Sequence, residues 1–304
     1  LVPDLEKPDQ IVNFTLYVFV PKKAQKSPLP VLVKISPEGT GTQEPIADYL
    51  LERGYAYACF NHIELDLDTY GNNVEGACQL VYPEYDWGSL AVWAWGAMRV
   101  VDYLVQESWV ESSETLVNVD PEKIIVTGHS RRGKTALIAG AFDERFSLVV
   151  PNGSGCGGAG SFLVLGPRSQ GVGSISSPKR YESWFQNDLK QFANNEKEMP
   201  FDQHLMRALV APRAVLSTDG FADLWANPMG TQTVYEGAQP VFDLFGVRKH
   251  NAIHFREGGH GFKKEDFKAI LDFADFLFFE KEIENEAKFY AKPFSFEKQR
   301  FEWE

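Results

Sequence analysis

Segments typical of strands and of helices alternate along almost the whole of this 304-residue chain. Residues 11–21, 31–36 and 55–60 have the short apolar runs or partial alternation expected of strands. Between the last two, apolar residues recur at helical spacing until Gly54, which is placed as a helix C-cap. Consecutive parallel strands need a crossover helix, so the pattern predicts a mainly parallel sheet with helices on both faces.

The second part of the chain repeats this design. An apolar helix is predicted over 87–105, and an amphipathic helix over 264–278 closes the fold. Strands followed by small or polar residues are predicted within the segments 123–130, 146–154, 211–220 and 251–262. We therefore expect a single α/β domain over 1–304, arranged as a three-layer αβα sandwich.

Charge and composition exclude several classes of protein. The formal net charge is −12 and no run of five basic residues is present, so nucleic acid is not an expected partner. The three cysteines have no C-x-x-C spacing and allow one disulfide at most. No apolar stretch reaches the roughly 20 residues that span a bilayer, and the first residues show no signal-peptide pattern.

The stretch "VTGHSRRGKTA" (126–136) places Ser130 between a predicted strand and a predicted helix. Such a turn lifts a serine oxygen out of the sheet and directs a helix N-terminus toward it, which suits a nucleophile. The alternative is a serine that only caps the helix. Arg132 stands where a small residue is usual, and glycine follows at Gly133.

Two further side chains complete a candidate catalytic set at the same edge of the sheet. His260, between glycines in "EGGHGF", is placed in a flexible-looking loop and can serve as general base. A carboxylate that orients this imidazole is expected at Asp223 or, as the second choice, at Asp219. The order Ser, Asp, His is the order that α/β-hydrolases use.

The other histidines fit the role of base less well. His129 is expected to point away from the turn, and His254 lies within a predicted strand. The remaining candidates are His62, His204 and His250.

A metal or a cofactor is not expected. The segment 64–73 weakly resembles a calcium loop, with Asp66, Asp68 and Gly71, but Tyr70 is unsuited to a ligand position and the distal glutamate is missing. Zinc-protease and phosphate-binding motifs are absent from the sequence.

The segment "GHSRRGKTALIAGAFDERFSLVVPNGSGCGG" resembles the core of the glucuronoyl esterases, carbohydrate esterase family 15, whose nucleophile motif is G-C/H-S-R-x-G-K. The segments "YDWGSLAVWAWGAMRVVDYL", "FDQHLMRALVAPRAVL" and "DLWANPMGTQ" also resemble bacterial members. The likeness implies an α/β-hydrolase that cleaves esters between 4-O-methyl-glucuronic acid of xylan and lignin alcohols. It also implies a secreted or periplasmic protein, expected to be a monomer, with a polysaccharide-linked uronic acid ester as substrate.

The resemblance also implies roles for individual residues. Arg131 would stabilise the oxyanion through its backbone N–H and its guanidinium. Lys134 would bind sugar hydroxyls, the alternative being a solvated helix lysine. Trp225 would contact the sugar ring, the alternative being a loop tryptophan in the core.

Two departures from the fungal pattern stand out. Gly153 occupies the position of the glutamate that serves many members as the acid, which favours Asp223. Counting back from Trp184, Gly173 and Tyr181 replace a glutamine and a glutamate that contact the sugar, and Glu182 lies one place off.

These departures keep other functions open. One is a methyl or acetyl esterase acting on a different polysaccharide that contains uronic acid. Another is a carbohydrate-binding protein that retains a hydrolase scaffold without catalysis.

Overall fold

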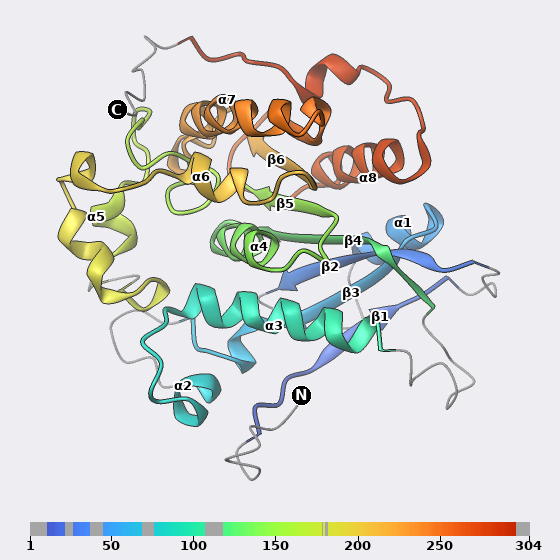
Figure 1. Cartoon of the computed structure of the whole chain (residues 1–304), viewed down its shortest axis with the longest axis horizontal. Helices are drawn as coiled ribbons and strands as arrows, with labels where there is room; N and C mark the ends of the chain where they lie inside the picture. The colour runs from blue at the N-terminus through green and yellow to red at the C-terminus, as the bar shows by residue number, and fades with distance from the viewer. Residues whose placement is uncertain are drawn as a thin grey trace.

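A seven-stranded sheet with the order β1-β3-β2-β4-β5-β6-β7 forms the centre of the molecule (Figure 1). The computed structural model describes residues 11–21, 27–36, 45–68, 76–106, 118–177, 179 and 182–295. The strands are β1 (Leu16–Phe19), β2 (Leu29–Ser36), β3 (Ala56–Asn61), β4 (Val119–His129), β5 (Leu148–Asn152), β6 (Ala214–Gly220) and β7 (Asn251–Arg256).

Six of these strands run parallel, and the edge strand β1 pairs antiparallel with β3. Parallel strands are buried on both faces, which explains their continuous apolar runs. In β2, for example, Val31 and Val33 contribute to one core cluster and Leu32 to the other. The predicted mainly parallel sheet is confirmed.

Helices cover both faces of the sheet. The core cluster on one face includes residues of α3 (Ser89–Leu104), α4 (Arg131–Phe142) and α7 (Pro228–Leu244). On the other face, α1 (Pro45–Glu52) and α8 (Lys264–Phe279) pack their apolar sides against β2, β3, β5 and β6. The molecule therefore has the predicted three-layer αβα arrangement.

The remaining helices within the described residues are short. They are α2 (Ala77–Val81), α5 (Val172–Ile175), α6 (Gln203–Ala208) and the 3₁₀ turns η1 (His62–Glu64), η3 (Glu182–Trp184), η4 (Asn187–Phe192), η5 (Glu196–Glu198), η6 (Leu224–Ala226), η7 (Arg248–His250) and η8 (Glu286–Phe289). No helix of the described residues has the length and apolar character of a membrane span. All three cysteines are buried, and none of them forms a disulfide.

The carboxyl ends of the parallel strands meet at one edge of the sheet. The long segment between β5 and α6, which contains α5, lies on the side toward which the arrow of β2 points (Figure 1). It has its own small apolar cluster, which includes Cys156, Phe162 and Ile175. This edge is where ligands usually bind in open α/β sheets.

Candidate active site

Ser130 occupies a strained turn between β4 and α4. Its backbone has φ 61° and ψ −125°, a region that residues other than glycine rarely adopt. Its N–H donates to the carbonyl oxygen of Asn152 at 2.9 Å, which ties the turn to the end of β5. Strained backbone of this kind collects at functional sites, and here it sets the serine at the N-terminus of a helix.

Two glycines make room for this turn, and they explain how Arg132 fits. A Cβ on Gly128 would lie 2.4 Å from the carbonyl oxygen of Arg132, so the strand itself supplies the space that helix α4 needs. A Cβ on Gly133 would lie 2.8 Å from the carbonyl oxygen of Asn152. The close approach of helix and strand thus depends on Gly128 and Gly133, and position 132 can carry a long side chain.

His260 and Asp223 are hydrogen-bonded to each other. The imidazole Nδ1 lies 2.6 Å from Asp223 Oδ2. The histidine side chain is 38% exposed and the carboxylate 3%, so the acid is covered while the imidazole reaches solvent. This is the relation that an orienting acid has to a general base.

Asp219, the other carboxylate considered above, lies within β6 and is 1% exposed. Burial, together with the negative charges of Asp223 and Asp266, raises the pKa of Asp219 well above its usual range. The hydrogen-bond partner of His260 Nδ1 is Asp223 and not Asp219. The geometry therefore pairs His260 with Asp223.

His129 was expected to point away from the turn, and this expectation is wrong. Its ring lies 4.3 Å from the ring of His260, centroid to centroid. Its Nδ1 lies 2.6 Å from Asn152 Oδ1, and the amide of Asn152 donates to Thr218 at 3.0 Å (carbonyl oxygen) and 2.8 Å (Oγ1). With the Asn152 oxygen as acceptor, His129 Nδ1 carries the proton. Burial and the neighbouring His260 lower the pKa of His129 to about 4, so this ring stays neutral.

Gly153 lies close to the same groups. Its φ is +49°, and a Cβ there would lie 3.3 Å from His129 Cε1 and 3.4 Å from Asp223 Oδ2. His129 and Asp223 thus border the place where the fungal pattern has a glutamate. The acid of this chain, Asp223, therefore lies next to the position at which the fungal pattern has its glutamate.

The guanidinium of Arg131 is held by Asp68. Its Nη1 donates to Asp68 Oδ2 at 2.7 Å, and its Cζ lies 4.8 Å from the centre of the Trp184 ring. Asp68 Oδ2 also lies 3.5 Å from His62 Nε2. Burial raises the pKa of Asp68, but hydrogen bonds and the charge of Arg131 outweigh it and hold that pKa well below its usual range.

The same contacts account for the carboxylates of the segment that weakly resembles a calcium loop. Asp68 binds Arg131, and Asp66 Oδ2 accepts from Gln79 Nε2 at 2.8 Å. Tyr70 and Gly71 lie outside the described residues. Within the described part of the chain, no group of three or more His, Cys, Asp or Glu side chains could hold a metal ion.

Lys134 is not the solvated lysine considered as an alternative, because its side chain is 1% exposed. Its ammonium donates to the carbonyl oxygens of Ser154 and Cys156 and, at 3.2 Å, to Gln170 Oε1. Three protein oxygens account for its three protons. Burial lowers the pKa of Lys134 to about 8. A sugar hydroxyl would have to replace one of these partners, and the distant Gln170 oxygen is the weakest held.

Gln170 was missed in the sequence. Counting back from Trp184 pointed to Gly173, which is exposed in α5, whereas the glutamine beside Lys134 lies three residues earlier. The backbone N–H of Gln170 donates to the carbonyl oxygen of Trp225 at 3.1 Å. Gln170 is the glutamine nearest in sequence to position 173.

The other predicted sugar-contact residues are placed unevenly. Trp225 lies in η6, directly after Asp223 and Leu224, and is 39% exposed, so it is not a core tryptophan. Glu182 begins η3, but its side chain lies outside the described part of the structure. Tyr181 lies outside it as well.

Known proteins are similar to this chain over most of its length. A family described as "Glucuronyl esterase, fungi" matches residues 4–246. A curated carbohydrate esterase from an unknown prokaryotic organism is 32% identical over 246 residues, covering 74% of this chain and 54% of its own length. A 4-O-methyl-glucuronoyl methylesterase from Phanerochaete chrysosporium is 32% identical over 175 residues, covering 57% of this chain and 35% of its own length. The chain thus spans about half or less of these curated relatives.

Solved structures agree with this result. A carbohydrate esterase family 15 glucuronoyl esterase from Caldicellulosiruptor kristjansonii superposes with a TM-score of 0.83 at 31% identity, covering 94% of this chain and 77% of that one. A glucuronoyl esterase from Solibacter usitatus gives a TM-score of 0.75 at 28% identity, covering 90% and 79%.

Proposed function

Because this chain belongs to the glucuronoyl esterase family, we propose that it is a serine esterase that hydrolyses esters of 4-O-methyl-glucuronic acid. The ester joins the uronic acid carboxyl of glucuronoxylan to an alcohol of lignin. Curated relatives are named 4-O-methyl-glucuronoyl methylesterases, which supports a carboxylic ester of this uronic acid as substrate. The observation that carries the proposal is the Asp223–His260 hydrogen bond beside the strained turn at Ser130.

In the first half of the reaction, Ser130 Oγ attacks the ester carbonyl carbon and His260 Nε2 takes the hydroxyl proton. The C–O bond to the alcohol then breaks, and the imidazolium returns its proton to the leaving oxygen. The product that stays behind is a glucuronoyl ester of Ser130. Asp223 keeps the proton of His260 on Nδ1 and stabilises the imidazolium, since its oxygen lies 2.6 Å from that nitrogen.

In the second half, His260 removes a proton from water, and the hydroxyl oxygen attacks the acyl carbon. Collapse of the tetrahedral intermediate releases the uronic acid and returns the proton to Ser130. Each half of the reaction passes through a tetrahedral intermediate that carries an oxyanion. We assign its stabilisation to the backbone N–H and guanidinium of Arg131, whose side chain Asp68 and Trp184 hold in place.

The sugar is proposed to lie against Trp225 and near the Lys134–Gln170 pair. Trp225 offers an exposed aromatic face in the turn that Asp223 caps. Gln170 connects the two, since its backbone contacts Trp225 and its side chain contacts Lys134. A polymeric substrate of this kind is reached outside the cytoplasm, which supports a secreted or periplasmic location.

The proposal is tested with a panel of methyl and benzyl esters of 4-O-methyl-glucuronic acid, glucuronic acid and galacturonic acid, and with acetylated xylose. We expect hydrolysis of the 4-O-methyl-glucuronate esters, abolished in Ser130→Ala and His260→Ala. Equal rates for wild type and Ser130→Ala would refute the assignment of the nucleophile. Faster hydrolysis of the acetyl ester would assign the enzyme to another substrate class.

A further inference from the structure

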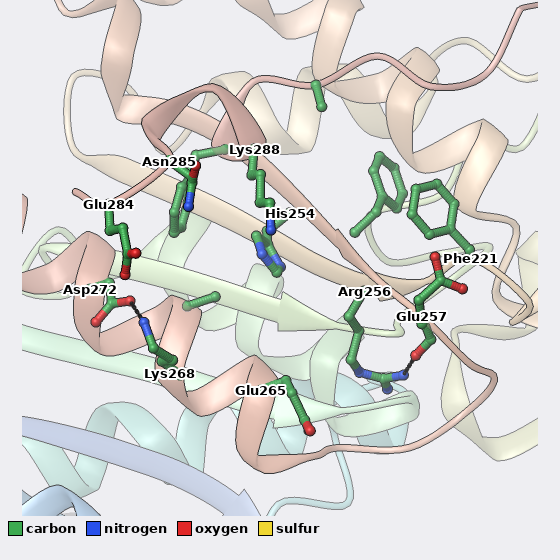
Figure 2. Close-up of a pocket in the computed structure, with 14 residues that line it drawn as sticks. Phe221, His254, Arg256, Glu257, Glu265, Lys268, Asp272, Glu284, Asn285 and Lys288 are labelled. Carbon is green, nitrogen blue, oxygen red and sulfur yellow. Dashed lines mark hydrogen bonds and ion pairs between the residues drawn. The ribbon is translucent and has the colours of Figure 1, made fainter.

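The loop after β7 that carries His260 is tied to one guanidinium, although its glycines suggested a flexible loop. Arg256, the last residue of β7, donates from Nη1 to the carbonyl oxygens of Glu257 at 3.0 Å and Gly259 at 3.2 Å. Its Nη2 donates to the carbonyl oxygen of Gly261. The carbonyl groups of both residues that flank His260 therefore bind the same side chain. Figure 2 shows the Arg256 side chain and its contact with Glu257.

Asp266 holds this guanidinium in turn. Arg256 Nε donates to Asp266 Oδ2 at 2.7 Å, and the two side chains are 6% and 0% exposed. The same carboxylate oxygen accepts from the backbone N–H of Lys263 at 2.8 Å, at the start of α8. A buried arginine paired in this way has little freedom to rotate, so the loop is fixed to both β7 and α8.

The loop is also joined to the turn that carries Asp223. The backbone N–H of Phe221 donates to the carbonyl oxygen of Arg256, and that of Ala222 to Gly258, both at 2.9 Å. A Cβ on Gly220 would lie 2.5 Å from the carbonyl oxygen of Gly258. The two segments could not approach so closely with any other residue at position 220.

We propose that Arg256 is a positioning residue for the esterase reaction, holding the peptide groups around His260 so that the imidazole keeps its place between Asp223 and Ser130. This inference rests on the proposed function. Arg256 contacts no reacting atom; it acts through the loop.

The chemistry of arginine explains why this residue type is needed. A planar guanidinium offers five N–H donors in a fixed fork, enough for one carboxylate and three carbonyl oxygens, whereas lysine has a single nitrogen. Without the fork, a loop with Gly258, Gly259 and Gly261 regains conformational freedom. A displacement of about 1 Å in a reacting group can cost about 100-fold in rate.

The pocket in Figure 2 would let a guanidinium ion from solution occupy the place of this side chain after truncation. Its volume is about 680 Å³, and Arg256 and Glu257 line it together with Lys268 and Asp272 of α8. The substitution Arg256→Ala would leave a guanidinium-sized space adjoining the pocket. Guanidinium chloride at millimolar concentration can therefore reach the carbonyl oxygens that the truncation leaves unpaired.

Arg213 provides a matched control. Its Nη1 donates to the carbonyl oxygens of Gly140, Asp143 and Phe146, so it also fixes a loop through three backbone groups. It precedes β6, at the end of the sheet opposite the active site. Arg213→Ala should lower Tm through the same kind of loss and leave kcat unchanged.

The experiment compares three variants, Arg256→Lys, Arg256→Ala and Arg213→Ala, with wild type. It measures kcat and KM with a benzyl glucuronate ester as substrate, and Tm by thermal unfolding. We expect kcat of Arg256→Lys to fall by about 100-fold with KM little changed, because the base is displaced while the sugar site is intact. Guanidinium chloride should raise the rate of Arg256→Ala and leave wild type unaffected.

Three results would overturn the proposal: kcat of Arg256→Lys close to that of wild type, an equal loss in Arg213→Ala, or no guanidinium effect on folded Arg256→Ala. If Arg256→Ala does not fold, Arg256→Lys keeps the ion pair with Asp266 and decides alone. The rate at which a fluorophosphonate probe labels Ser130 is measured in parallel. It depends on His260 but not on the sugar, so it tests Arg256 even if glucuronate esters prove not to be substrates.

Discussion

Replacing Asp223 by asparagine tests the pairing of His260 most sharply. The acid is 3% exposed and its Oδ2 lies 2.6 Å from His260 Nδ1, so an asparagine of the same shape fills the same space. Its amide would donate to Nδ1 and shift the imidazole proton to Nε2, the nitrogen that must accept the proton of Ser130. We expect kcat to fall by about 1,000- to 10,000-fold, with KM changed far less.

Asp219→Asn is the control for this substitution. Asp219 is buried, and burial together with the charges of Asp223 and Asp266 raises the pKa of its carboxyl. Because the acid hydrogen-bonded to His260 is Asp223, the amide at position 219 should leave kcat close to that of wild type. Steady-state release of benzyl alcohol measures both variants. Asp223 is not the orienting acid if Asp223→Asn retains a tenth or more of the activity, or if Asp219→Asn loses as much activity as Asp223→Asn.

Three further predictions concern stability. Gly133→Ala should unfold at a lower temperature and lose activity, since its Cβ meets the Asn152 carbonyl oxygen, whereas Gly173→Ala, in exposed helix, should be neutral or stabilising in thermal melts. Lys134→Met should lower the free energy of unfolding by about 3 kcal/mol in urea titrations, because buried acceptors lose their donor. Burial lowers the pKa of His129 and His254 to about 4. As the pH falls below about 6.5, these histidines therefore bind protons in the unfolded chain before they do so in the folded chain. The contribution of each histidine to stability should fall from there toward pH 4, by up to about 1.4 kcal/mol per pH unit. Burial raises the pKa of Asp66 to about 6, which opposes this slope, so the contribution is measured as the difference in unfolding free energy between wild type and His254→Gln; a difference independent of pH would contradict the prediction.

The sequence predicted the architecture well because its signals are local. Parallel strands that are buried on both faces are apolar throughout, and their intervening helices carry clear 3.6-residue spacing. Helix α7 was not predicted, since its sequence contains Pro240 in the interior and several polar residues that become buried, such as Thr231 and Gln232. These polar residues are buried by tertiary packing, which local sequence patterns do not predict.

The sequence predicted some features of the candidate site and missed others. The residues that follow strands, Ser130, Asp223 and His260, could be placed at one edge by topology alone. The contact of His129 with His260 could not, because it depends on a side-chain direction at the end of a strand. The environment of Lys134 was equally hidden, since its partners lie 20 to 36 residues away in an irregular segment.

The hydrogen bonds from Arg256 to the loop around His260 could not be predicted from the sequence either. A run of glycines around a histidine indicates freedom of the backbone, but not whether another side chain removes that freedom. The partners of Arg256 are only one to ten residues away along the chain, yet no spacing rule connects them.

Acylation of Ser130 by the uronic acid can be observed by rapid-quench mass spectrometry. Wild type is mixed with benzyl 4-O-methyl-glucuronate, quenched in acid during turnover and digested with protease. We expect a peptide with the added mass of one 4-O-methyl-glucuronoyl group on Ser130, absent from Ser130→Ala. Turnover with an adduct on another residue, or undiminished turnover by Ser130→Ala, would contradict this expectation.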